Sequence, residues 1–227
     1  MIGFDEYYSR PEVSNSDLSA LKNYFMPKEY QVDVTQAYRF GNLIDAMITE
    51  KHRCDFYSMK VDNERFMVKE WDQALAMRSA FEKDPFCRQL LQIIKGQAVK
   101  TKQVDIEHEG VRFTLPMRCK YDLWSDPLAW GGDIKSTTAT TQSQFEQACE
   151  YFDYDRQRAV YMTISGAHKD VLIGISKVNN KIFKKHITRD CDFYKSGMQK
   201  FQELAFMYWK LFGELEPQNH DTIIQSS

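Results

Sequence analysis

The sequence predicts an α+β protein in which a mixed sheet is flanked by helices. Hydrophobic residues at helical spacing dominate the first 95 residues, and strict alternation of hydrophobic and polar residues begins near residue 104. Helical and strand patterns then take turns as far as residue 212. The chain has 227 residues, 43% hydrophobic and 27% charged, and this balance excludes a largely disordered protein.

The first predicted elements are helices. Ser14 stands before an apolar run, as a helix N-cap does. An apolar stripe at i, i+3, i+4, i+7 and i+8 from Phe40 predicts a helix over residues 36–50. Residues 65–95 have a helical pattern in two pieces, interrupted near Asp84 and Pro85.

Strand patterns follow around Glu109-Gly110, which predicts a hairpin. The second strand continues past Pro116, with odd-numbered residues from 111 to 123 on one face and Arg118, Lys120 and Asp122 on the other. Later elements are expected at these residues: a strand over 130–136, one helix over 142–165, strands over 171–178 and 181–187, and an aromatic-rich helix over 193–212.

Gly and Pro are sparse, and no linker rich in Ser, Gly or Pro divides the chain. We therefore expect one domain over residues 1–213 and a polar, flexible tail over 214–227. No apolar run approaches the ~18–20 residues that span a bilayer, and the N-terminus has no signal-peptide pattern. We therefore expect a cytoplasmic protein without membrane association. Five widely spaced cysteines predict reduced thiols rather than a metal or redox motif.

Charge is uneven along the chain although the net charge is only −2. Residues 168–200 contain eight Lys or Arg and three Asp, which makes this segment +5 and the remainder −7. Such a segment is either a solvated face or a surface that faces phosphate groups.

Asp133 and Lys135 lie two residues apart on one predicted strand and therefore share a face. Antiparallel pairing with the preceding strand would bring Asp122 close to Asp133. Two converging carboxylates are costly unless a cation or proton lies between them, and oxygen ligands favour Mg²⁺ or Mn²⁺. Lys135 would orient or deprotonate a water, or stabilise charge on a phosphate. By itself the D-x-K triplet is commonly just a surface ion pair.

Two predicted helices add polar pairs at i and i+4, Gly41 with Asp45 and Gln157 with Tyr161. Together with the strands, the order of motifs resembles that of PD-(D/E)XK nucleases, most narrowly the phage-type RecE (exonuclease VIII) group of the RecB-like and lambda-exonuclease-like clan. The motifs are Gly41…Asp45, Cys119-Lys120-Tyr121-Asp122, Gly132-Asp133-Ile134-Lys135-Ser136-Thr137 and Tyr154-Asp155-Arg156-Gln157…Tyr161.

The resemblance implies a restriction-endonuclease-like αβββαβ core. It assigns metal binding to Asp122, Asp133 and the carbonyl of Ile134, and makes Lys135 the catalytic lysine. Asp45 stands where many relatives have a metal-binding histidine, and can itself ligate a hard cation.

The same resemblance places Gln157 and Tyr161 beside the active site, where they would hold DNA. Many relatives also have a glutamate on the strand before Asp122. This sequence has Gln103 in that region, with Asp105 or Glu107 as partial substitutes. The scattered cysteines predict that the iron–sulfur cluster of some relatives is absent.

The implied activity is a Mg²⁺- or Mn²⁺-dependent exonuclease that degrades linear double-stranded DNA from 5′ to 3′ in a bacterial host cell. The implied partners are a single-strand annealing recombination protein and further copies of the chain in a ring. Two alternatives stay open: a single-strand or repair/CRISPR-adaptation-type nuclease, and a non-catalytic DNA-binding module with a degenerate site.

Overall fold

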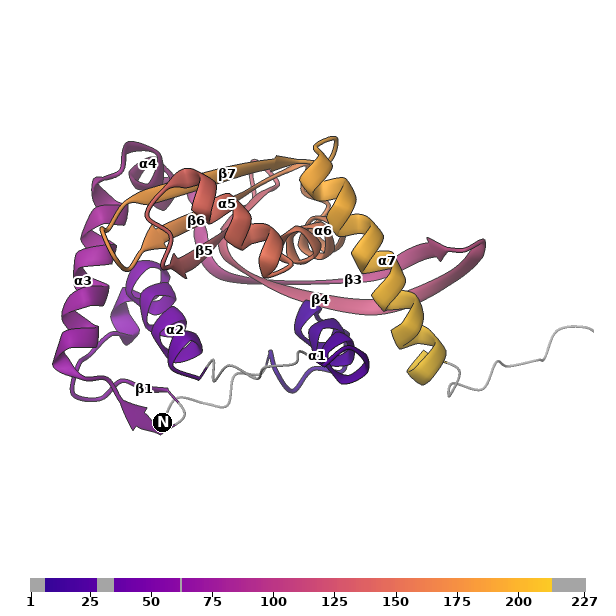
Figure 1. Ribbon diagram of the computed structural model, residues 1–227, viewed down its shortest axis with the longest axis horizontal. Coiled ribbons are helices and arrows are strands. Elements are labelled where there is room, and N and C mark those ends of the chain that lie inside the picture. Colours follow the sequence, from indigo (N-terminus) through magenta and orange to yellow (C-terminus); the bar gives the residue numbers. More distant parts are fainter. Residues whose placement is uncertain (1–6, 28–34, 62, 214–227) are drawn as a thin grey trace, which may run out of the picture.

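The computed structural model describes residues 7–27, 35–61 and 63–213. Its main feature is a five-stranded sheet with helices on both faces (Figure 1). The strand order is β3-β4-β5-β6-β7, and all neighbours are antiparallel except β5 and β6, which are parallel. The sheet is therefore mixed and flanked by helices, as predicted. The expected tail over residues 214–227 lies outside the described residues.

The helices and strands have these bounds: α1 (Asn15–Phe25), α2 (Thr35–Thr49), β1 (Lys60–Val61), β2 (Glu64–Arg65), α3 (Val68–Lys83), α4 (Pro85–Ile93), β3 (Lys95–His108), β4 (Val111–Ser125), β5 (Trp130–Thr137), α5 (Gln142–Tyr151), α6 (Tyr154–Ser165), β6 (Lys169–Ser176), β7 (Ile182–Thr188) and α7 (Asp192–Phe212). A single 3₁₀ turn, Lys51–Arg53, follows α2.

Side-chain caps fix the helix starts that the sequence predicts. The Ser14 hydroxyl accepts from the amide of Asp17 (3.3 Å), and the Asp17 carboxylate accepts from the amide of Ser14 (2.7 Å). Asp84 caps α4 by accepting from the amide of Cys87 (3.0 Å), with Pro85 at the first helical position. This cap explains why the helical pattern of residues 65–95 is interrupted there.

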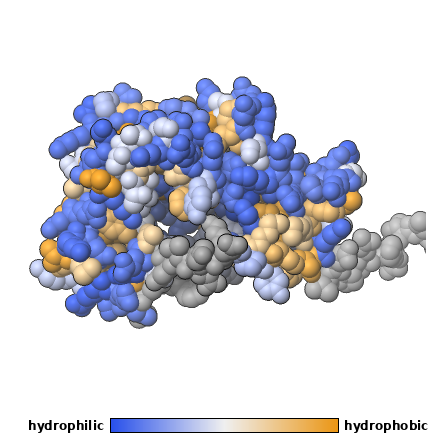
Figure 2. All heavy atoms as spheres, in the orientation of Figure 1, coloured by the Kyte–Doolittle hydropathy of each residue, from blue (hydrophilic) through white to orange (hydrophobic). Residues whose placement is uncertain are grey.

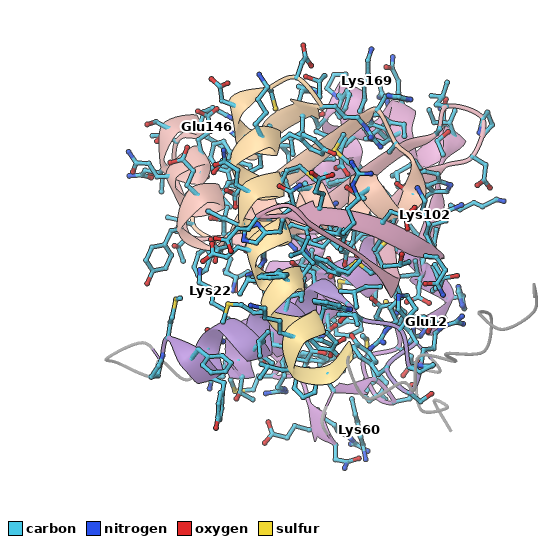
Figure 3. All side chains as sticks on the ribbon, turned by 90° about the vertical axis from the view of Figure 1, so that its right-hand side faces the viewer. Glu12, Lys22, Lys60, Lys102, Glu146 and Lys169 are labelled. Atoms are coloured by element: carbon cyan, nitrogen blue, oxygen red, sulfur yellow. The ribbon has the colours of Figure 1, made fainter. Side chains whose placement is uncertain are left out.

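One predicted helix is wrong, because residues 142–165 form two helices. The chain turns at Asp153, which has a left-handed backbone conformation (φ 53°). Its carboxylate binds Lys22 of α1 (2.5 Å) and Lys200 of α7 (2.9 Å). Figure 3 shows α7 crossing in front of the sheet, with Lys22 labelled close to it. Long-range ion pairs therefore break a pattern that is locally helical.

Two hydrophobic cores lie on opposite faces of the sheet. One joins the sheet to α1, α5, α6 and α7, and the other joins it to α2, α3 and α4. Strand β6 serves both, because Leu172 packs in the first core while Val171 and Ile173 pack in the second. The apolar stripe of α7 is buried through Phe201, Leu204 and Ala205, while its C-terminal end leaves an apolar patch on the surface (Figure 2).

The basic segment 168–200 is divided among several parts of the fold. Lys184 pairs with Asp84 (2.6 Å), and the Arg189 guanidinium donates to the carbonyls of Ala167 and Met162 (2.8 Å each). Lys177 lies at a cavity described below. The segment is therefore not one continuous phosphate-facing stripe. All five cysteines are free thiols.

Within the residues that the structure describes, every helix is too short or too polar to cross a bilayer. The small hairpin β1–β2 is an addition that the sequence did not predict. Each of its strands has two residues, which is too short for an alternating pattern to be recognised.

Candidate active site

The site lies where β4 and β5 separate. Their ladder runs from Ser125 opposite Trp130 to Leu123 opposite Gly132, and no further pair follows. On the other side of β4, Asp122 also lacks a ladder partner, because Gln97 of β3 has a left-handed conformation (φ 54°). Backbone irregularities of this kind change the direction in which a strand's side chains point.

This irregularity corrects one expectation. The sequence predicts that odd-numbered residues keep one face of β4 as far as Leu123. Residues up to Tyr121 do pack in the core with α6 and α7, but Leu123 packs in the opposite core with α2. Trp124 returns to the first core and contacts the Tyr121 ring (5.0 Å between centroids). The face reverses at Asp122, the position that sequence analysis assigns to metal binding.

Asp122 and Asp133 meet across the separated strands, as predicted. The Asp122 carboxylate accepts a hydrogen bond from the backbone amide of Ile134 (2.9 Å), directly after Asp133. The close approach requires glycine before Asp133, since a Cβ on Gly131 would lie 2.1 Å from the Tyr121 ring. The sequence Gly-Gly-Asp is thus explained by packing at position 131.

Asp133 is buried between two cations. Its Oδ2 lies 2.5 Å from Nζ of Lys135, and its Oδ1 lies 3.2 Å from Nη2 of Arg158. Burial raises the pKa of the Asp133 carboxyl, but Lys135 and Arg158 outweigh it and hold the pKa below its usual range. Burial lowers the pKa of Lys135, but Asp133 outweighs it and raises the pKa above its usual range. Both groups are therefore charged at neutral pH.

Asp45 of α2 adds a third carboxylate. Burial, together with the charge of Asp122, raises the pKa of Asp45 well above its usual range. Burial and the charge of Asp133 raise the pKa of Asp122 to about 7. Lys135 opposes both shifts, and Lys120 also opposes that of Asp45, but burial and carboxylate repulsion outweigh them, so protons relieve part of the negative charge near neutral pH. A divalent cation would relieve it more completely.

The donor atoms suit such a cation. Asp45, Asp122, Asp133 and the carbonyl of Ile134 offer only oxygen, the ligand that Mg²⁺ and Mn²⁺ prefer. Within residues 7–27, 35–61 and 63–213, no set of three acidic, histidine or cysteine side chains already surrounds one point. The Asp133 Oδ2 atom is paired with the Lys135 ammonium. The residues present therefore fit a divalent cation in chemistry.

Arg158 is a site residue that sequence analysis missed. Its side chain is fully buried and reaches Asp170 (3.5 Å) as well as Asp133. It lies over the rings of Tyr161 and Tyr121, at 4.2 and 5.4 Å from their centroids. Burial raises the pKa of Asp170 to about 6 although Arg158 opposes this. The available signal was an arginine on the apolar stripe of α6.

Gln157 and Tyr161 lie in different environments in the structure. Tyr161 is buried, with its ring edge-on to Tyr121 (5.1 Å between centroids). Gln157 is partly exposed, and its Oε1 is buried without a hydrogen-bond partner among the described residues. Contact of these two side chains with DNA stays a prediction, and Tyr161 supports the site through Arg158.

The proposed substitutes for a glutamate on the preceding strand are wrong. Register places Gln103 opposite Pro116 and Asp105 opposite Thr114, well along the hairpin from Asp122. Asp105 accepts from the Thr114 hydroxyl (2.7 Å), and Glu107 pairs with Arg112 (2.8 Å). The hairpin is long, so charges near its turn do not reach the site.

Comparison with known proteins decides the family. The family described as "PDDEXK-like domain of unknown function (DUF3799)" matches residues 19–222. The chain belongs to this family. The predicted PD-(D/E)XK resemblance is therefore confirmed, and a PDDEXK-like fold agrees with the mixed sheet and its flanking helices.

Solved structures similar to this PDDEXK-like chain include a candidate exonuclease from Eubacterium rectale. The two share 16% identity over 99% of this chain and 93% of that chain, with a TM-score of 0.64, which supports the fold. A phage related exonuclease from Haemophilus somnus is 12% identical over 75% of this chain and 82% of that chain, with a TM-score of 0.38. An alkaline exonuclease from Laribacter hongkongensis is 12% identical over 88% and 93%, with a TM-score of 0.33. No curated protein matches the sequence.

Proposed function

We propose that this PDDEXK-like protein is a metal-dependent deoxyribonuclease that hydrolyses phosphodiester bonds of linear double-stranded DNA as an exonuclease. One observation carries the proposal. Three buried carboxylates interact at the separated ends of β4 and β5, where burial and mutual repulsion outweigh the nearby lysines for Asp45 and Asp122, and this negative charge calls for a cation. The membership of the PDDEXK-like family supports the same conclusion.

Asp45, Asp122, Asp133 and the Ile134 carbonyl would hold Mg²⁺ or Mn²⁺. When bound, the ion would polarise the scissile phosphate and lower the pKa of an attacking water. Arg158 holds one oxygen of Asp133 from the buried side, and the Ile134 amide holds one oxygen of Asp122. Each carboxylate is thus oriented before any ligand arrives.

Lys135 has the role of a cation near the reacting phosphate. Asp133 keeps its ammonium protonated, so it donates hydrogen bonds and stabilises negative charge instead of removing a proton from water. Of the roles that the sequence left open for Lys135, the structure therefore favours stabilisation of negative charge on the phosphate. The direction of digestion, a ring of several copies and an annealing partner stay predictions that rest on the resemblance to RecE-type exonucleases.

The test is digestion of linear duplex DNA labelled at either the 5′ or the 3′ terminus, with Mg²⁺, Mn²⁺ or EDTA. We expect metal-dependent loss of the 5′ label first, and no digestion by Lys135→Ala or Asp133→Ala. Lys181→Ala is the matched control, since this lysine is exposed and outside the site.

Other outcomes are informative. Preferential digestion of single strands would favour the repair-type alternative. DNA binding without cleavage under either metal would overturn the enzyme and leave a binding module.

A further inference from the structure

A cavity of about 470 Å³ opens beside Lys135, and neither Asp122 nor Asp133 lines it. It lies between the C-terminal end of β5, the start of α2, helix α5 and the segment after β6. Its volume falls in the range of about 300–1,000 Å³ that is typical of small-ligand sites. Lys135 belongs to both places, so a molecule in the cavity lies next to the proposed reaction centre.

The charge of this cavity is opposite to that of the carboxylate site. Its lining includes the lysines Lys135 and Lys177 and no acidic residue. The Lys177 ammonium lies over the Phe40 ring (4.6 Å), and no carboxylate in the described part of the chain pairs with it. Its backbone is fixed on both sides, by the Thr137 carbonyl (2.7 Å) and the Gln73 amide (2.8 Å). These bonds hold the backbone of Lys177, and its ammonium has no carboxylate partner among the described residues, so the ammonium is available to an anionic ligand.

The opposite wall is aromatic. Phe152 and Tyr154 stack with 5.7 Å between their centroids and 26° between their planes. Phe152 is 55% exposed because the chain turns sharply at Asp153 and leaves the ring at the end of α5. Tyr154 also lies under the Lys135 ammonium (4.8 Å). An exposed aromatic face beside a cation is suited to a planar, negatively charged ligand.

We infer that this cavity binds one unpaired nucleotide, with its base stacked on Phe152 and its phosphate between Lys135 and Lys177. The inference rests on the proposed nuclease function and narrows it to a substrate whose end nucleotide leaves the duplex stack. The bound nucleotide is either the last nucleotide of a strand or a free mononucleotide, since both present a base and a phosphate. The bond to be cut would then join that nucleotide to its neighbour.

The test is a binding cycle between Phe152 and the base. Dissociation constants are measured in EDTA for a single-stranded oligonucleotide and for copies that lack the base at the 5′ end, the 3′ end or the centre. For the wild type, we expect removal of one terminal base to weaken binding by roughly tenfold, within the span of base–aromatic stacking. Phe152→Ala should weaken binding of the intact oligonucleotide by a similar factor. Removal of the same terminal base should then weaken binding by this variant no further.

Matched variants separate stacking from charge and folding. Tyr57→Ala removes another exposed ring, which neither lines the cavity nor stacks on Phe152, and should change binding less than twofold. Phe152→Tyr should restore the wild-type response to the base. Lys177→Gln should weaken intact and base-less oligonucleotides by the same factor, because it acts on the phosphate.

A deoxymononucleotide added as competitor tests the second source, and displacement that depends on Phe152 supports the inference. Equal binding of intact and base-less oligonucleotides, with no Phe152-dependent mononucleotide binding, would overturn it. The same proteins are assayed for cleavage with Mg²⁺ and Mn²⁺. Cleavage without a Phe152–base coupling would overturn the cavity and leave the nuclease, whereas coupling without cleavage would overturn the nuclease alone.

Discussion

The two sides of Asp133 differ in a way that separates function from stability. On the buried side, one guanidinium (Arg158) faces Asp170 between two tyrosine rings, and positive and negative charges balance. On the other side, Asp45 and Asp122 join Asp133 against Lys135, and Lys120 is a further cation that acts on Asp45. Burial is similar in kind, but only the second side has unbalanced charge. Charge imbalance, rather than burial, therefore marks the side that is built for a ligand.

The largest expected effect comes from removing the ammonium of the unbalanced side. Lys135→Ala should lower kcat for DNA by roughly 10²- to 10³-fold, the range for loss of one hydrogen-bond donor that stabilises developing negative charge. The same change should tighten Mn²⁺ binding, because no cation then competes for the Asp133 Oδ2 atom. Calorimetric titration with Mn²⁺ and single-turnover cleavage measure the two effects. Weaker Mn²⁺ binding would contradict the competition.

Substitutions on the balanced side, at Arg158 and Asp170, should mainly change the free energy of unfolding. Arg158→Met leaves Asp170 buried without its partner, and we expect a loss of about 3–5 kcal/mol in the free energy of unfolding. Urea denaturation measures it. The double variant Arg158→Met/Asp170→Asn removes both charges and should recover most of the loss. If the single and double variants are equally unstable, the pair is not the balanced unit described here.

A third expected effect is on pH dependence. In EDTA, folded Asp122 has a pKa of about 7, whereas its ordinary value is 3.8. Between these values the folded state holds a proton that the unfolded chain has lost, so stability should fall as pH rises from about 4 to about 7. Urea unfolding at several pH values measures the slope. Asp122→Asn should make the slope shallower and leave the contribution of Asp45, whereas saturating Mn²⁺ should reduce both; an unchanged slope in the variant would exclude Asp122 as a source.

The smallest effect concerns Gly41, one turn before Asp45 in α2. No atom lies within 4 Å of a Cβ built at this position, so packing does not require glycine. Gly41→Ala should raise the free energy of unfolding by about 0.5–1 kcal/mol. DNA affinity should nevertheless fall a few-fold if the open space admits the DNA backbone. Unchanged affinity would show that this space is not used.

Much of the fold followed from local patterns. The Asp84-Pro85 break, the Glu109-Gly110 hairpin and the meeting of Asp122 with Asp133 each depend on residues close in sequence or on simple strand pairing. The PD-(D/E)XK resemblance implied metal binding and catalysis for these aspartates and Lys135, which stays a prediction, whereas the family match bears out the resemblance itself.

Other features depend on distant residues and were not predictable. The turn at Asp153 needs Lys22 and Lys200, which are 131 and 47 residues away. Arg158 stands on the buried face of α6, but the charge pair with Asp170 that stabilises it there depends on β6, a different element. The reversal at Asp122 follows from the conformation of Gln97, for which the alternating pattern gives no sign.

The separation of β4 and β5 gives the molecule a built-in spectroscopic probe. The amide of Ile134 donates to the Asp122 carboxylate, so a side chain supplies the acceptor for this backbone proton. A protonated carboxyl is a weaker acceptor than a carboxylate. Hydrogen–deuterium exchange at this one amide should therefore follow the ionisation of Asp122, and its NMR signal reports on the state of the site before any substrate is added.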